Sequence, residues 1–438
     1  MRSILLRAPK SPFVPATVES TLEKNLIGNN SGNLVFIHAA WKLLETRESE
    51  VAPAGLGGQP MRAAELSERH DVYVAPLADA FRLGWETSLE RMAAFIEQLT
   101  IPVVILGVGA QGGVSFSPER LEPIEPIVKR FVRAVLDHGP SIGVRGETTA
   151  TYLEGLGFRD VEVIGCPSMF LYGDRLEVTK RVPAIERESR LAMNIGHSTR
   201  SPYLSQLGDL IEHHVQRYPN LTHFAQDRST LELLVTGTIS PRTLELPRMP
   251  IPLSHPLLRR GRVRFYIEPW PWIEDLAGYD FAFGSRIHGN IAALLAGTPA
   301  FVLAHDARTL ELVRYFEIPH RAVPDLPRDA DAADLYADAD YGPLMRGHAR
   351  RWVRFAEYLQ RHGLSHVFAG GEDPTAFDRR IATISYPPAI TAPGRLTRMR
   401  WAAEGGIGRG RRFAGRVRRG IGRRARRAVG RLTGGDLA

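Results

Sequence analysis

The sequence predicts an α/β protein with two domains of similar size, each built on a parallel sheet wound by helices, followed by a long terminal helix and a basic tail. Short apolar runs typical of buried strands alternate with helical patterns along most of the chain. The alternation stops over the charged, irregular residues 173–188 and then restarts. A chain of 438 residues is also too long for one compact core. We therefore expect domains at 1–185 and 186–375, and a linker with an arginine-rich tail at 376–438.

In the first half, residues 27–45 contain a loop of Asn, Ser and Gly and then an expected helix. Its apolar positions Leu34, Ile37, Trp41 and Leu44 follow the helical period. Further along, we expect strands at 70–76, 101–109, 141–145 and 161–165. Helices are expected at 87–99, from the capping pair Ser117-Pro118 onward, and at 147–157.

The second half repeats the alternation. We expect strands at 190–196, 221–227, 262–269 and 279–284, a helix at 203–219, and an apolar helix from Asn290 to Ala296 followed by a strand at 300–304. Residues 344–363 form the last expected helix, which is long and amphipathic. This order predicts that the second domain resembles the first.

The net charge of +8 comes from the end of the chain. Residues 395–438 contain 14 arginines against two acidic residues, so the rest of the chain has a net charge of −4. A single cysteine, Cys166, excludes an internal disulfide framework and fits a reducing compartment. No apolar run approaches the length that spans a bilayer, and the N-terminus lacks the apolar core of a signal peptide. We expect a cytoplasmic protein.

The stretch "FGSRIHGN" places Ser285, Arg286 and His288 between a strand and the next helix. In wound parallel sheets, ligands bind in the loops beyond the carboxyl ends of the strands. An arginine beside a helix N-terminus, here near Asn290, makes an anion site, and a neighbouring histidine can exchange a proton near neutral pH. The alternative is that Arg286 pairs with a surface carboxylate and His288 caps the helix.

Arg145 follows a strand of the first half in the same way, although it could instead pair with Glu147. The glycines at 107, 109 and 112 have the spacing of a dinucleotide fingerprint, but the next helix begins only at Ser117, so we expect a different ligand and no NAD. No cluster of ligand residues suggests a metal, and no cofactor is implied. Cys166 is interpreted as a small buried residue because no activating pair adjoins it in the sequence.

Weaker candidates are polar side chains at other strand ends and loops. They could hold sugar hydroxyls or could serve only as caps and turn residues. They are Asn30 before the first helix, Gln111 in the glycine loop, Gln226 and Asp227 after the strand at 221–225, and His305 after the strand at 300–304.

Four stretches of the chain resemble the polysaccharide pyruvyl transferase family. They are "IGNNSGNLVFIHAAWKLL", "GVGAQG", "VRGETTATYLEGLGFRDVEVIGCPSMFL" and "YDFAFGSRIHGNIAALLAGTPAFVLAHDARTLEL", which together span roughly residues 25–320. The last is the most specific, because Gly-x-Arg-x-His-Gly before a small-residue helix is the family's hallmark. The resemblance implies a fold of glycosyltransferase-B type, in which two Rossmann-like domains face each other and a terminal helix crosses back.

The resemblance also implies a reaction. Phosphoenolpyruvate would be the donor, two hydroxyls of one sugar in a glycan or lipid-linked precursor the acceptor, and a cyclic pyruvate ketal and phosphate the products. Under this reading His288 supplies a proton to the enol carbon. Arg286 and Arg145, one from each domain, hold the donor phosphate and carboxylate together with Ser285 and Asn290. Asp227 and His305 are candidates for removing the hydroxyl protons.

Three alternatives remain open at the level of the sequence. The same fold could house a nucleotide-sugar glycosyltransferase, and a degenerate member could bind glycans without catalysis. The arginine tail could bind nucleic acid, although the acidic body and the scarcity of aromatic residues in the tail make this unlikely. The stretch 410–432 also carries one narrow apolar stripe among its arginines, which is typical of a helix that lies on an anionic membrane surface, here at the inner face. The alternative is that residues 395–438 are a disordered arginine-rich extension, because the glycines between 405 and 420 weaken any helix.

Overall fold

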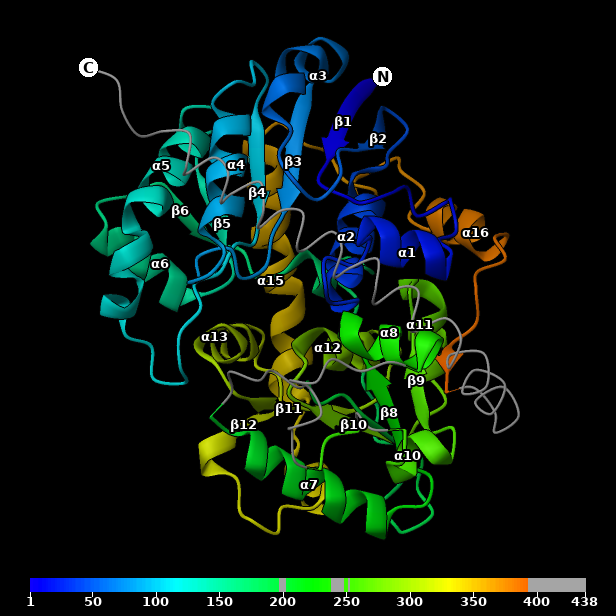
Figure 1. Cartoon of the computed structure of the whole chain (residues 1–438). Coiled ribbons are helices and arrows are strands. Elements are labelled where there is room, and N and C mark those ends of the chain that lie inside the picture. Colours follow the sequence, from blue (N-terminus) through cyan, green and yellow to red (C-terminus); the bar gives the residue numbers. More distant parts are fainter. Residues whose placement is uncertain (197–201, 238–247, 251–252, 393–438) are drawn as a thin grey trace, which may run out of the picture.

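The computed structural model describes residues 1–196, 202–237, 248–250 and 253–392 (Figure 1). The chain forms two α/β parts, one above the other in Figure 1, with α2, α12 and α13 between them. We call the part built on β1 to β6 the N-terminal unit and the part built on β7 to β13 the C-terminal unit.

The N-terminal unit is built on a parallel sheet with the strand order β2-β1-β3-β4. A further parallel pair, β5 and β6, joins it through a bridge between Val108 and Val144. The strands are β1 (Arg2–Leu6), β2 (Ser49–Pro53), β3 (Val72–Pro76), β4 (Val103–Leu106), β5 (Ile142–Val144) and β6 (Val161–Val163). The helices are α1 (Val18–Lys24), α2 (Gly32–Leu44), α3 (Ala63–Arg69), α4 (Glu86–Ile96), α5 (Glu125–Leu136) and α6 (Glu147–Gly155), with short 3-10 segments that include η3 (Pro167–Phe170).

The C-terminal unit is built on a sheet with the order β12-β11-β10-β7-β8-β9-β13, parallel except for the edge strand β13. Its strands are β7 (Leu191–Met193), β8 (Thr222–Ala225), β9 (Val263–Phe265), β10 (Phe281–Gly284), β11 (Ala300–Ala304), β12 (His320–Ala322) and β13 (Ile390–Thr391). Its helices are α7 (Leu204–Arg217), α8 (Arg228–Thr236), α10 (Pro256–Arg259), α11 (Pro269–Leu276), α12 (Ile287–Leu295), α13 (Ala307–Phe316) and α14 (Ala332–Asp338).

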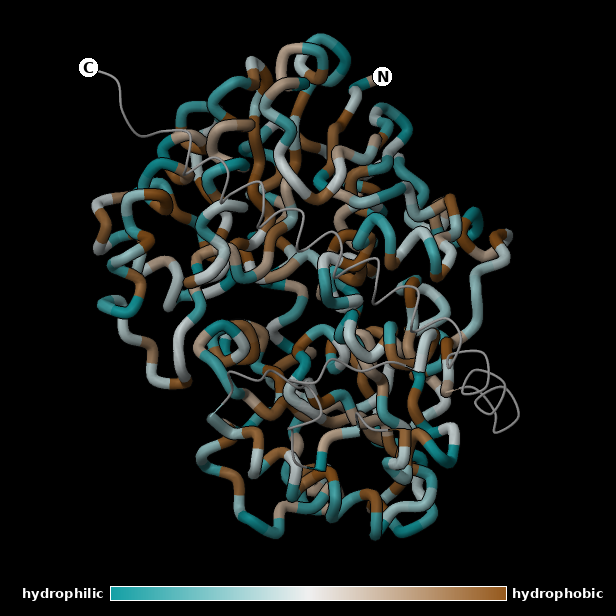
Figure 2. The backbone as a smooth tube through the Cα atoms, in the orientation of Figure 1, coloured by the Kyte–Doolittle hydropathy of each residue, from teal (hydrophilic) through white to brown (hydrophobic). Residues whose placement is uncertain are grey.

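The strands are apolar because helices cover both faces of the sheets. Every residue of β3, β4, β10 and β11 is buried, as expected for strands at the centre of wound parallel sheets. Figure 2 shows the hydrophobic colour along these strands and the hydrophilic colour on the outer loops and helices. Helix α2 differs from a surface helix: nearly all of its residues are buried, because it packs between η3 and α12 of the opposite unit.

The end of the described chain crosses between the units twice. Helix α15 (Gly342–Arg361) runs back to the N-terminal unit, where the Tyr358 hydroxyl donates to the carbonyl of Ile105 at 2.8 Å. Helix α16 (Ala376–Ala382) packs there through Phe377, whose ring lies 5.2 Å from that of Phe13, and β13 then joins the C-terminal sheet. Residues 376–392 are therefore a folded part of the molecule, which corrects the linker expected from the sequence.

The predicted fold class is confirmed: the protein is α/β with parallel sheets, and two such units joined by a crossing helix form the glycosyltransferase-B arrangement. Residues 173–188 contain no helix or strand, as expected for a connection. The exact domain boundaries remain a prediction. No helix in the described ranges is both long and apolar enough to cross a membrane.

Candidate active site

A cleft of about 1520 Å³ lies between the two units and is lined by residues of both. The N-terminal unit contributes the loops after β1 and β3, the ends of α1 and α2, and part of α4. The C-terminal unit contributes the loops that follow β8, β10 and β11. These loops lie beyond the carboxyl ends of parallel strands, where wound folds bind their ligands.

Arg286 and His288 both line this cleft. They do not both lie in a loop, as the sequence had suggested. Helix α12 begins at Ile287, three residues earlier than expected, so Arg286 is its N-cap and His288 lies in its first turn. The His288 side chain is only 8% exposed. Its ring packs against the ring of Phe36 from α2, with centroids 5.2 Å apart. His288 therefore sits where the two units meet.

The Arg286 guanidinium forms an ion pair with the Asp227 carboxylate, and both side chains are about one-fifth exposed. The backbone beside Asp227 is tied to the opposite unit, because Asn30 and Asp227 form an antiparallel bridge. The amide N–H of Ser31 donates to the carbonyl of Gln226 at 2.9 Å as part of this contact. The first turn of α2 and the Arg286 site are thus held together.

Ser285 lines the cleft, whereas Asn290 stabilises this loop from behind. The Ser285 hydroxyl accepts the amide N–H of Gly196 at 3.1 Å. Asn290 is fully buried and exchanges two amide hydrogen bonds with Asn194, at 3.1 and 3.0 Å. Its amide also donates to the carbonyl of Gly284 at 2.9 Å. Asn290 is not among the residues that line the cleft, and its contact with the donor remains a prediction.

Arg145 is also placed differently from the prediction. Its side chain is fully buried behind the wall of the cleft and does not line it. The guanidinium donates to the carbonyls of Gly107 at 2.8 Å and Leu77 at 2.9 Å. Arg145 and Arg286 do come from different units, but only Arg286 faces the ligand space. The positive charge of Arg145 therefore influences groups in the cleft, such as His288, although its side chain does not line the cleft.

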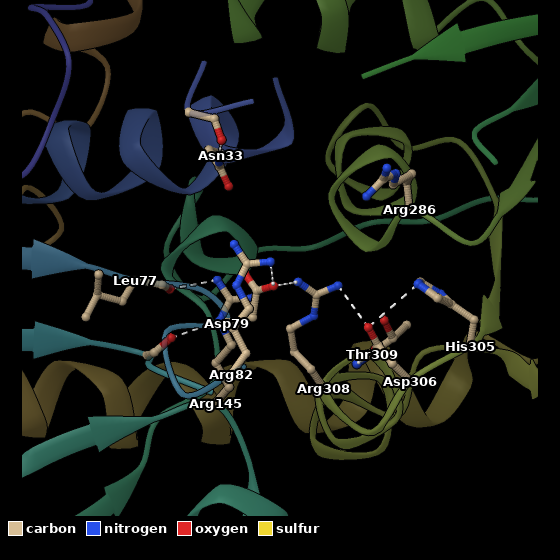
Figure 3. A network of polar contacts seen from close by, with 12 residues as sticks. Asn33, Leu77, Asp79, Arg82, Arg145, Arg286, His305, Asp306, Arg308 and Thr309 are labelled. Atoms are coloured by element: carbon tan, nitrogen blue, oxygen red, sulfur yellow. Dashed lines mark hydrogen bonds and ion pairs between the residues drawn. The ribbon is translucent and has the colours of Figure 1, made fainter. Parts of the chain in front are cut away.

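A row of charged side chains crosses the cleft instead, running from Arg82 through Asp79, Arg308 and Asp306 to His305 (Figure 3). Arg308 lies 2.9 Å from the Asp79 carboxylate of the N-terminal unit and 3.1 Å from Asp306 of its own unit. Asp306 also caps α13, because it accepts the amide N–H of Thr309 at 2.7 Å. His305 Nε2 lies 3.6 Å from the Asp306 carboxylate.

The cleft is rich in hydrogen-bond donors with positive charge. Among the described residues, seven cationic side chains line it against three carboxylates: Arg7, Lys24, Arg82, Arg91, Arg120, Arg286 and Arg308 against Asp79, Asp227 and Asp306. Several buried nitrogen atoms of these lining residues lack a partner within the described ranges, namely Nε of Arg7, Arg82, Arg286 and Arg308, and Nε2 of Gln226. Unsatisfied buried donors are costly, so this cleft favours a ligand that supplies acceptors and negative charge.

The pKa values of both histidines of the cleft are lowered. Burial lowers the pKa of His288 well below its ordinary value, and the charges of Arg145 and Arg308 lower it further. Burial also lowers the pKa of His305, with Arg308 and Arg286 acting against the opposing effect of Asp306. An anion bound beside them would offset these positive charges and favour the protonated ring.

The cleft is also lined by the other polar candidates predicted from the sequence, namely Asn30, Gln111, Gln226, Asp227 and His305. In the glycine loop, Gly112 lines the cleft, whereas Gly107 has a φ of +77° and a Cβ there would lie 2.3 Å from the carbonyl oxygen of Gly165. Gly107 is therefore needed for packing rather than for close approach to a ligand.

The described residues contain no group of three or more His, Cys, Asp or Glu side chains placed to hold a metal ion.

Sequence reasoning missed Asp79, Arg308 and Cys166. Asp79 follows β3 directly, so the strand-end rule that identified Arg286 could have found it. Arg308 lies in the first turn of α13, which follows the loop after β11. No local signal pairs Cys166 with His288, because 122 residues separate them in the chain.

The model of the polysaccharide pyruvyl transferase family matches residues 18–307. This range covers more than half of the chain and includes the Arg286 and His288 loop, so the protein belongs to the polysaccharide pyruvyl transferase family, which is a family of enzymes. The resemblance inferred from the sequence motifs is confirmed. None of the curated proteins matches the chain.

Solved structures show a distant likeness over most of the chain. The UDP-GlcNAc 2-epimerase of Methanocaldococcus jannaschii has 13% identity and a TM-score of 0.43, with 82% of this chain and 99% of that chain covered. HepE of Anabaena, solved with UDP and glucose, has 13% identity and a TM-score of 0.40, with 87% and 98% covered. These scores are too low to carry an argument about function.

Proposed function

We propose that the protein transfers pyruvate from phosphoenolpyruvate onto two hydroxyls of one sugar in a polysaccharide or its precursor, forming a cyclic ketal and releasing phosphate. The observation that carries the proposal is Arg286 and His288 at the start of α12, inside a cleft lined by seven cationic side chains, four of which have a buried Nε without a partner in the described ranges. Membership of the pyruvyl transferase family supports the same reaction.

The donor requires what these residues offer. Phosphoenolpyruvate carries a phosphate and a carboxylate, and Arg286 can hold either group through two parallel hydrogen bonds. Arg308 supplies a second cation at the cleft wall, and Asp79 and Asp306 hold it in place. Arg145 adds positive charge from behind the wall, without contact. This division of roles replaces the pair of contacting arginines expected from the sequence.

The chemistry also requires a proton. His288 donates it to C3 of the donor, C2 becomes electrophilic, and the first sugar hydroxyl adds there. Phosphate then leaves C2 with its bridging oxygen, and the second hydroxyl closes the ketal ring. Of the two hydroxyl protons released, one replaces the proton that His288 gave and the other leaves with phosphate or solvent. Burial and the charges of Arg145 and Arg308 lower the pKa of His288, and the negative charge of the donor acts in the opposite direction and favours the protonated ring.

Two groups in the cleft can accept the hydroxyl protons. The Asp227 carboxylate is close to Arg286, which favours its ionised form, and His305 lies 3.6 Å from the Asp306 carboxylate. Asn30, Gln111 and Gln226 offer amides for sugar hydroxyls. These side chains come from both units of the molecule.

Thermal unfolding with candidate donors tests the proposal. Phosphoenolpyruvate should raise the Tm of the wild type, because a ligand that binds only the folded state stabilises it. Arg286→Ala should lose this shift, whereas Arg133→Ala, an exposed arginine of α5 outside the cleft, should keep it. If UDP-sugars raise the Tm and phosphoenolpyruvate does not, the protein is instead a nucleotide-sugar glycosyltransferase.

A further inference from the structure

The imidazole of His288 contacts a thiol. Cys166 Sγ lies 3.6 Å from His288 Nε2, and the Ser168 hydroxyl donates to the same sulfur at 3.0 Å. Cys166 and Ser168 are fully buried and belong to the N-terminal unit, at the start of η3, whereas His288 belongs to α12 of the C-terminal unit. The contact therefore forms only when the two units are together.

The contact between Cys166 and His288 allows two directions for its hydrogen bond. A hydroxyl and a thiol each have one hydrogen to donate, and a neutral imidazole has one donor and one acceptor nitrogen. Because the Ser168 hydrogen points at Sγ, the thiol hydrogen is free to point at Nε2. If the thiol donates to His288, Nε2 is the acceptor nitrogen and the ring hydrogen is on Nδ1. If Nε2–H donates to the sulfur, the ring hydrogen is on Nε2.

We propose that Cys166 is a positioning residue for His288, whose thiol fixes the ring so that Nδ1 is the nitrogen that serves the cleft. The role of that nitrogen in proton transfer rests on the function proposed above, whereas the position of the hydrogen does not. Cys166 itself does not line the cleft, so it does not touch the substrate.

A thiol suits a ring that must change its charge during turnover. A carboxylate in this place would stabilise the imidazolium and retain its proton. The thiol can donate to Nε2 when that nitrogen has no hydrogen. It can accept from Nε2–H when the ring is protonated and also after Nδ1 has given its proton, so the contact persists without strongly favouring any of these states. Phe36 on the ring face and Cys166 at Nε2 leave the orientation of the ring unchanged while the proton moves.

The position of the hydrogen can be measured directly on the wild-type protein. In protein labelled with ¹⁵N-histidine, long-range ¹H–¹⁵N correlation distinguishes the two neutral tautomers, and the His288 signals are those absent from His288→Asn. We expect the wild type without ligand to show hydrogen on Nδ1, and Cys166→Ala to shift the population toward hydrogen on Nε2. Hydrogen on Nε2 in the wild type, or an unchanged spectrum in Cys166→Ala, would overturn the proposal.

Kinetics provide the second test. Removing one neutral hydrogen bond should lower kcat of Cys166→Ala by about fivefold to tenfold with little change in KM for phosphoenolpyruvate. Cys166→Ser should restore part of the rate, because a hydroxyl can both donate and accept. Cys166→Asp should extend activity to higher pH, because a carboxylate favours the protonated ring.

The matched control is Thr298→Ala, which removes another buried hydrogen bond, from the Thr298 hydroxyl to the carbonyl of Leu276 at 2.8 Å, beyond the far end of α12. It should lower stability while leaving the rate and the His288 tautomer unchanged. If it lowers the rate as much as Cys166→Ala, the effect of Cys166 is one of packing alone and the proposal is wrong. If the protein transfers no pyruvate at all, the tautomer measurement still decides the role of Cys166.

Discussion

Arg308 and Asp79 form an ion pair of 2.9 Å that joins the C-terminal unit to the N-terminal unit at the wall of the cleft. Both side chains are less than one-fifth exposed, so water screens the pair only in part. Asp306 holds the same guanidinium from the other side at 3.1 Å. The position of this cation therefore depends on both units at once.

Arg308→Ala should destabilise the protein more than Asp79→Asn. The first change leaves Asp306 without its arginine and Asp79 with only Arg82, at 3.4 Å, at a cost of roughly 3 kcal/mol in the free energy of unfolding. The second leaves Arg308 paired with Asp306. Urea denaturation measures both. The exposed pair Arg321 and Asp338 is the control, because Arg321→Ala should cost less than about 1 kcal/mol. Equal losses at both arginines would contradict the account.

Arg286→Lys should weaken binding of phosphoenolpyruvate by about tenfold or more, although the charge is kept. A lysine cannot form two parallel hydrogen bonds with a phosphate or carboxylate, and each lost charge-assisted bond is worth about 1.5–3 kcal/mol. Isothermal calorimetry gives the Kd. Arg133→Lys should bind as the wild type does. Wild-type affinity in Arg286→Lys would remove Arg286 from the donor site.

The sequence predicted the fold well because its signals are local. Apolar runs such as those of β3 and β4 identify buried strands, and their order implies parallel sheets. Helix α2 shows the limit of this reasoning. Its apolar stripe suggested one buried face, but the opposite unit covers the rest, and even Lys42 is buried beside Asp378 of α16. Packing between units leaves no periodic signature in the sequence.

The sequence predicted residues of the candidate site only where a polar side chain directly follows a strand. Arg286 and His288 were found in this way, and both line the cleft. Arg145 occupies an equivalent strand end, but its side chain turns inward to the carbonyls of Gly107 and Leu77. The direction of a long side chain depends on neighbours distant in sequence. The contact between Cys166 and His288 has the same origin.

Glu311 should make stability depend on pH. Its carboxylate accepts the amide N–H of Thr149 at 3.0 Å, in the first turn of α6 in the opposite unit. Burial raises the pKa of Glu311 from its ordinary 4.5 to about 7, against the hydrogen bonds of Thr149. The folded protein therefore binds a proton that the unfolded chain releases between these values. This contribution to stability is present below pH 4.5 and is lost as the pH rises to about 7.

Glu311→Gln should remove this loss of stability at higher pH, because glutamine stays neutral and its carbonyl oxygen can still accept the amide N–H of Thr149. Relative to the wild type, the variant should gain roughly 1–3 kcal/mol in the free energy of unfolding between pH 5 and pH 8. Denaturation curves at several pH values measure the difference. The exposed Glu154 of α6 is the control, since Glu154→Gln should show no such trend. A difference independent of pH would contradict the prediction.

The arginine-rich residues 395–438 lie outside the described ranges, and their membrane contact remains a prediction from the sequence. We expect the full chain to float with anionic vesicles but not with neutral ones, and salt to reduce the binding, because each basic residue near the surface contributes about 1 kcal/mol. Removal of 395–438 should abolish flotation. Equal flotation of the shortened protein would disprove the role of the tail, and binding to nucleic acid instead would favour the alternative.

The central claim is that Arg286 and His288 use phosphoenolpyruvate to form a ketal on a sugar. The most direct measurement combines phosphate release with mass spectrometry of a panel of glycan and lipid-linked acceptors. The account predicts one phosphate for each acceptor that gains pyruvate less water, and a loss of about 100-fold or more in His288→Asn. Phosphate release without a modified acceptor, or wild-type turnover in His288→Asn, would contradict it.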